Sequence, residues 1–182
     1  DMIAMSAPRF LRVRMPRVVG PRSAPADAAS LRREGNDAFK RGDYDLACAC
    51  YTGALDLWLP PADRAICLTN RAAARLKSTD PAAHHRALAD AERATSLDAS
   101  NFKSHLRHGQ ALRILGHDVD AILALRKASA LDAAAEAELN LALREVQRSP
   151  ASAATLREVD AKAALARSVA ATAAASVVND LT

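Results

Sequence analysis

The sequence has 182 residues, of which half are apolar, 3% are aromatic and 44 are alanine. This length fits one ordinary domain with extensions, and alanine, a small residue with high helix propensity, favours close-packed helices over a β-sandwich or barrel. The sequence contains no run of about 18 apolar residues that would predict a membrane span. Its three cysteines do not form a disulfide framework. We therefore predict an all-α protein.

The net charge of +4 belongs mainly to the N-terminal stretch. Residues 1–30 contain five arginines against two acidic residues, whereas residues 31–148 have a net charge of +1 and residues 149–182 have none. A nucleic-acid-binding domain would concentrate basic residues on its folded surface, so nucleic acid is not an expected partner. We interpret residues 1–30 as a disordered basic leader. Arginine-rich leaders are also typical of mitochondrial transit peptides, which remains an alternative.

No sequence motif indicates a catalytic or nucleotide-binding site. The glycine-rich nucleotide-binding patterns, the zinc-protease motif and the serine-hydrolase motif are all absent from the sequence. The histidines lack cysteine or carboxylate neighbours at metal-ligand spacing. We predict that the chain is not an enzyme and that it uses neither a cofactor nor a metal.

From residue 31 onward, apolar and small residues recur with helical spacing. The segment 31–59 is predicted to form two amphipathic helices separated by a turn at Gly42-Asp43, and Pro60-Pro61 is predicted to end the second helix. Segments 65–77 with 85–100, and then 102–133, repeat this design. The sequence thus predicts three helix-turn-helix units.

The spacing of the units is regular. The small residue of each first helix falls at Gly35, Ala72 and Gly109, so both steps are 37 residues long. Such self-similarity is typical of a helical solenoid. Extra residues relative to a repeat of about 34 residues are expected in the linker 60–63 and in the turn 79–81, where they cost little stability.

These three units resemble the tetratricopeptide repeat family. The resemblance covers residues 31–133 and implies a solenoid of three repeats. Residues 134–148 continue as an amphipathic helix, which we expect to cap the apolar end of the stack, giving a repeat domain over 31–148. The alanine-rich segment 149–182 is expected to form one more helix, over about 153–178, as a tail or as the start of a further domain.

The first helices of the three units carry polar residues on what would be the concave face. They are Arg32 and Asn36, Asn70, and Lys103 with Arg107. Residues four apart lie on the same side of a helix. Arg32 and Asn36 therefore share one side of their helix, and so do Lys103 and Arg107. Three cations and two amides in one groove suit an anionic ligand, because charge-assisted donors bind carboxylate oxygens strongly.

This pattern resembles the carboxylate clamp of co-chaperones that bind the C-terminal Glu-Glu-Val-Asp tail of heat-shock proteins 70 and 90. The clamp has lysine, asparagine, asparagine, lysine and arginine in these places, and this sequence departs only at Arg32. The resemblance implies that Arg32, Asn36, Asn70 and Lys103 hold the two carboxylates of the last aspartate. It also implies that Lys103 and Arg107 meet polar groups upstream.

Within the clamp co-chaperones, the segments 42–57, 62–77 and 90–94 are most similar to the N-terminal module of UCS-type myosin chaperones. That resemblance implies a peptide-binding co-chaperone adaptor in the cytoplasm, with heat-shock protein tails as partners and myosin as a candidate client. Chaperone-organising proteins, U-box co-chaperones and clamp-type immunophilins or phosphatases share the pattern. A structural scaffold within a larger, organellar assembly is the competing hypothesis.

Overall fold

The computed structural model describes residues 27–148 and 150–179, with only the backbone for residue 166 and residues 169–179. All regular elements in these ranges are helical. They are α1 (Ala28–Arg41), α2 (Tyr44–Asp56), α3 (Pro61–Arg75), α4 (Pro81–Leu97), α5 (Phe102–Ile114), α6 (Asp118–Leu131), the short 3₁₀ helix η1 (Ala133–Ala135), α7 (Glu136–Gln147) and α8 (Pro150–Asn179). No described helix is both long enough and apolar enough to cross a lipid bilayer.

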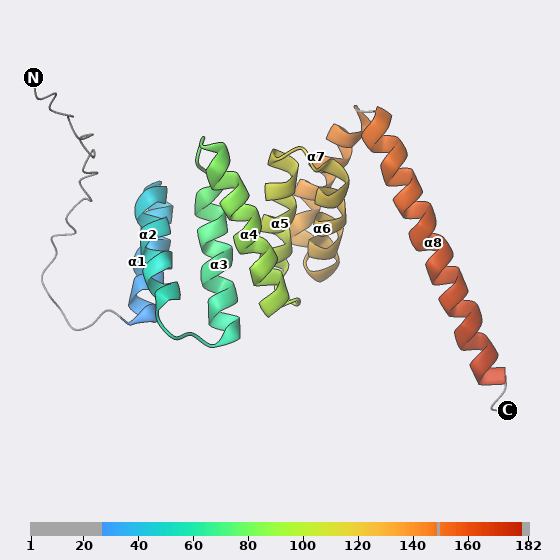
Figure 1. The fold of residues 1–182 in the computed structure, drawn as a ribbon, viewed down its shortest axis with the longest axis horizontal. Helices are drawn as coiled ribbons and strands as arrows, with labels where there is room; N and C mark the ends of the chain where they lie inside the picture. Colours follow the sequence, from blue (N-terminus) through green and yellow to red (C-terminus); the bar gives the residue numbers. More distant parts are fainter. Residues whose placement is uncertain (1–26, 149, 180–182) are drawn as a thin grey trace, which may run out of the picture.

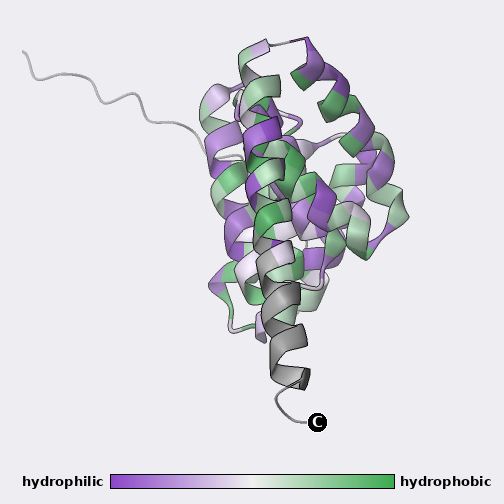
Figure 2. Cartoon of the chain, turned by 90° about the vertical axis from the view of Figure 1, so that its right-hand side faces the viewer, coloured by the Kyte–Doolittle hydropathy of each residue, from purple (hydrophilic) through white to green (hydrophobic). Residues whose placement is uncertain are grey.

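Consecutive helices pack in pairs, and the pairs follow one another along the molecule (Figure 1). The first helices form one layer, because α1 contacts α3 and α3 contacts α5. Viewed from the α8 end, hydrophobic and hydrophilic residues alternate along the helices, as amphipathic packing requires (Figure 2). The prediction of three helix-turn-helix repeats followed by a capping helix is confirmed.

Local sequence signals place most helix boundaries. Gly42 and Gly116 adopt φ angles of 82° and 80° in the turns that follow α1 and α5, a conformation that residues with a Cβ rarely adopt. The second pair has no such glycine. There, the Asp80 carboxylate caps the N-terminus of α4 and Pro81 provides its first residue.

Two predicted boundaries differ from the structure. Helix α2 ends at Asp56, four residues before Pro60, so the proline pair does not end it; Pro61 instead begins α3, where a missing N–H costs no hydrogen bond. Helix α1 begins at Ala28 rather than residue 31, because the Asp27 carboxylate accepts a 2.6 Å hydrogen bond from the Ser30 N–H. The rest of the predicted leader, residues 1–26, lies outside the described residues.

The three small residues spaced 37 apart lie at close contacts between the two helices of each repeat. A Cβ placed on Gly35 would lie 2.7 Å from Cε1 of Tyr51, and one on Gly109 would lie 2.5 Å from Cγ of Leu125. In the second repeat, Ala72 packs against Ala87 and Ala91, and all three are fully buried. Glycine therefore accompanies a large partner and alanine a small one, which keeps the packing dense in each repeat.

Replacing Gly109 with alanine should lower the free energy of unfolding by about 1–3 kcal/mol, because the new methyl group would overlap Leu125. Gly53→Ala is the matched control. Its Cβ would lie 3.4 Å from the Leu31 side chain, and alanine favours the α2 helix, so stability should stay the same or rise. Chemical denaturation of both variants checks this. Equal loss in the two would contradict the close-contact interpretation.

The end of the stack is held by polar contacts as well as by apolar packing. Arg113 of α5 forms ion pairs with Glu138 and Glu145 of α7, at 3.1 and 3.2 Å. Helix α8 packs Leu156 against the cluster that α6 and α7 form, and its Asp160 pairs with Arg126 of α6. The expected alanine-rich helix is thus present over Pro150–Asn179, and it is anchored at its N-terminal half.

Candidate functional site

The candidate site lies on the layer formed by α1, α3 and α5. Contacts between buried or partly buried polar groups fix these helices relative to one another. The Thr69 and Ser104 hydroxyl groups are 2.7 Å apart and buried, joining α3 to α5, and the Asn70 amide Nδ2 donates to Asn36 Oδ1 at 3.1 Å, joining α3 to α1. A buried hydrogen bond is costly to leave unmade, so these pairs favour one arrangement of the helices.

Three of the five predicted residues line one hollow of about 220 Å³. It contains Asn36 of α1, Asn70 of α3 and Arg107 of α5. Sequence reasoning missed the other residues that line it, which are Phe39, Lys40, Tyr51 and Ala73. Two of them could have been found from the sequence. Phe39 and Lys40 follow Asn36 by three and four residues and therefore lie on its side of α1.

The amide groups are held in defined orientations. Burial raises the pKa of Tyr51 to about 12, so its hydroxyl stays protonated and donates to Asn36 Oδ1 at 2.8 Å. Asn36 Oδ1 therefore accepts from both Tyr51 and Asn70, and the Asn36 amide keeps its Nδ2 group for another acceptor. The geometry presents an N–H donor at the hollow.

Arg107 is a cation without a carboxylate partner among the described residues. Its Nη1 donates to Gln110 Oε1 at 2.7 Å, and its Nε is buried with no hydrogen-bond acceptor. Burial lowers the pKa of the Arg107 guanidinium, and the charge of Glu138 acts in the opposite direction. A half-buried cation that lacks a counter-charge is poorly solvated and is stabilised by an anion.

The two remaining predicted residues lie outside the hollow. Arg32 is engaged by Asp63 of α3, with Nη1 and Oδ1 2.8 Å apart. Lys103 is exposed at the start of α5, and its ammonium group lies 5.9 Å from the centre of the Phe102 ring. The structure thus brings together Asn36, Asn70 and Arg107, and places Arg32 and Lys103 outside the hollow that these three residues line.

A second hollow, next to the first, extends the groove towards α7. It has a volume of about 420 Å³ and also contains Phe39, Ala73 and Arg107. Lys77 adds positive charge to its lining, whereas the charge of Arg113 is balanced there by Glu138. Leu76 and Ile114 add apolar surface. An extended segment with both apolar and acidic side chains suits such a lining.

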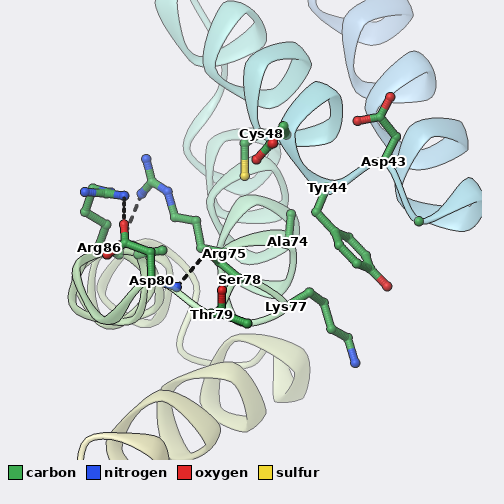
Figure 3. A pocket seen from close by; sticks show the side chains of 13 residues that line it. Asp43, Tyr44, Cys48, Ala74, Arg75, Lys77, Ser78, Thr79, Asp80 and Arg86 are labelled. Carbon is green, nitrogen blue, oxygen red and sulfur yellow. Dashed lines mark hydrogen bonds and ion pairs between the residues drawn. The ribbon is translucent and has the colours of Figure 1, made fainter.

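The larger hollow at the turns of the first two repeats, about 690 Å³, has a different character (Figure 3). Arg86 is paired there with Asp80 at 3.2 Å, and Arg75 is paired with the buried Asp90 at 2.6 Å. Because its arginines already have carboxylate partners, this hollow is less suited to bind an anion than the smaller hollow. No group of three histidine, cysteine or acidic side chains among the described residues is placed to hold a metal ion.

Comparisons with known proteins agree with this architecture. No family model matches the chain. The second repeat domain of human RPAP3, solved in complex with the HSP70 peptide SGPTIEEVD, is 31% identical, has a TM-score of 0.55, and is matched over 93% of its length by 63% of this chain. The chain belongs to the tetratricopeptide repeat family.

Two further matches are unc-45 proteins. The Xenopus laevis protein unc-45 homolog B is 39% identical over 90 residues, which is 50% of this chain and 9% of that relative. The myosin chaperone UNC-45 from C. elegans, solved in complex with an Hsp90 peptide, is 29% identical with a TM-score of 0.60, covering 68% of this chain and 14% of that one. This tetratricopeptide repeat chain therefore spans only a small part of the curated relatives it matches.

Proposed function

We propose that the chain is a peptide-binding co-chaperone adaptor whose α1–α3–α5 groove holds the acidic C-terminal tail of heat-shock proteins 70 and 90. The observation that carries the proposal is Arg107, a half-buried cation without a carboxylate partner among the described residues, placed beside Asn36 and Asn70. The complexes of the human RPAP3 and C. elegans UNC-45 domains with such peptides support it.

The proposed binding mechanism uses fixed donors. The terminal carboxylate of the ligand accepts from the Asn36 Nδ2 group and from Asn70, while Arg107 supplies the counter-charge. Arg32 and Lys103 complete the clamp by turning towards the ligand from α1 and α5. Because the two amides are already held by protein contacts, little side-chain entropy is lost on binding.

The proposal extends to location and client. The heat-shock proteins that carry this tail make the cytoplasm the proposed compartment, and the arginine-rich leader that favours the mitochondrial alternative lies outside the described residues. A myosin-type client is proposed because the matched UNC-45 protein is a myosin chaperone.

A peptide ending in Met-Glu-Glu-Val-Asp should bind with a dissociation constant of micromolar order, about 8 kcal/mol, as expected for a short ligand held at a few points. The same peptide with an amidated C-terminus should lose most of this affinity, since the amide lacks the terminal negative charge. Isothermal titration calorimetry of both peptides checks this. Equal binding of the acid and the amide would contradict the clamp and favour the scaffold hypothesis.

A further inference from the structure

The ion pair between Arg32 and Asp63 occupies one of the clamp cations. Arg32 Nη1 and Asp63 Oδ1 are 2.8 Å apart, and the two side chains are 31% and 42% exposed. The contact joins α1 to α3, the same helices that the Asn36–Asn70 hydrogen bond joins. Arg32 precedes Asn36 by one helical turn and Asp63 precedes Asn70 by two, so both contacts lie along one seam.

Asp63 is the acidic residue at the start of α3. It lies in the first turn of α3, where the helix dipole favours a negative charge. Arg107 and Lys103, in contrast, have no carboxylate within ion-pair distance among the described residues. Within the described chain, Arg32 is therefore the clamp cation that already has a protein counter-charge.

We infer that Asp63 competes with the carboxylate of the ligand for Arg32 and thereby limits the affinity of the groove. The inference rests on the proposed function and adds to it a residue that sets binding strength. For Arg32 to bind the ligand fully, the Arg32–Asp63 contact must loosen. The Asp63 charge also repels an acidic peptide that approaches along the same seam. Both effects act in the same direction.

The expected effect is moderate. Partly exposed ion pairs contribute little, so removing the competitor should tighten binding by about two- to fivefold. The direction of the change in affinity distinguishes two roles of Asp63. If Asp63 competes for Arg32, its removal tightens binding; if it holds Arg32 in a productive orientation, its removal weakens binding.

The test is a double-mutant cycle on the full chain, using the Met-Glu-Glu-Val-Asp peptide and calorimetry. Asp63→Asn should tighten binding by about two- to fivefold in the parent protein and by clearly less when combined with Arg32→Ala, where only the direct repulsion of the peptide is relieved. Asp63→Ser, which replaces the carboxylate with a smaller neutral polar group, provides a second variant if Asp63→Asn lowers the melting temperature. Glu158→Gln, an equal charge change on the exposed part of α8, is the control and should not alter affinity.

Unchanged or weaker binding by both Asp63 variants would overturn the inference, as would an equal gain in the Arg32→Ala background or in Glu158→Gln. A parent protein that binds the acid and amide peptides equally would contradict the proposed function itself, and the inference with it. A parent that prefers the acid but does not respond at Asp63 would contradict the inference alone.

Discussion

Asp90→Ala should lower the free energy of unfolding by about 3–5 kcal/mol, the largest stability effect that we expect from a single substitution. The Asp90 side chain is 7% exposed and accepts hydrogen bonds from two arginines of α3. Arg71 donates from Nε and Nη2 at 2.9 and 2.8 Å, and Arg75 donates from Nη1 at 2.6 Å. Removing the carboxylate leaves two poorly solvated cations side by side.

Thermal and chemical denaturation of Asp90→Ala measure this effect. Glu92→Gln is the matched control, because it neutralises an acid two residues along α4 whose side chain is 57% exposed. Its stability should stay within about 0.5 kcal/mol of the parent protein. A loss in Asp90→Ala no greater than in Glu92→Gln would show that the arginines find solvent or other acceptors when Asp90 is absent.

Arg107→Met should reduce peptide binding at least about tenfold, equivalent to about 1.5–3 kcal/mol, because a hydrogen bond to a charged group is lost. The free energy of unfolding of this variant should not fall, and it should rise if the desolvation of Arg107 is costly. The desolvation is visible in two features: burial lowers the pKa of this guanidinium, and its Nε has no hydrogen-bond acceptor. Methionine keeps an unbranched apolar stem of similar reach. Loss of binding without loss of stability is the expected combination.

Calorimetry and denaturation on the same preparation check both parts of that expectation. Arg93→Ala removes an equal charge from an exposed position on α4 and should leave peptide affinity unchanged. If Arg107→Met binds like the parent protein, the hollow beside Asn36 and Asn70 is not the carboxylate site. If the variant unfolds more easily than the parent protein, the Arg107 side chain stabilises the fold, and methionine does not replace its contacts.

Much of the fold could be predicted because the relevant signals are local. The glycine turn at 42–43, the helix breaks near residues 60 and 80, and the 37-residue spacing of Gly35, Ala72 and Gly109 are all properties of short stretches of chain. Spacing identified the small residues, although not their partners. Whether glycine or alanine is needed depends on the residue across the interface, Tyr51 in the first repeat and Leu125 in the third.

The candidate site was less accessible. The pattern on the first helices selected Asn36, Asn70 and Arg107, which the structure places in one hollow. The role of each in binding stays a prediction. The same pattern could not distinguish Arg107, which has no carboxylate partner among the described residues, from Arg32, which is paired with Asp63, because both are arginines on a helix face.

The sequence by itself determined the helix pairs, their number and the surface on which the polar residues gather, since these follow from periodicity and turn chemistry. Only the tertiary structure decided how the charges are distributed. Asp90 joins Arg71 and Arg75 across 19 and 15 residues of chain, and Asp63 joins Arg32 across 31. Ion pairs depend on distance in space and on burial, and neither is encoded in the spacing of residues along one helix.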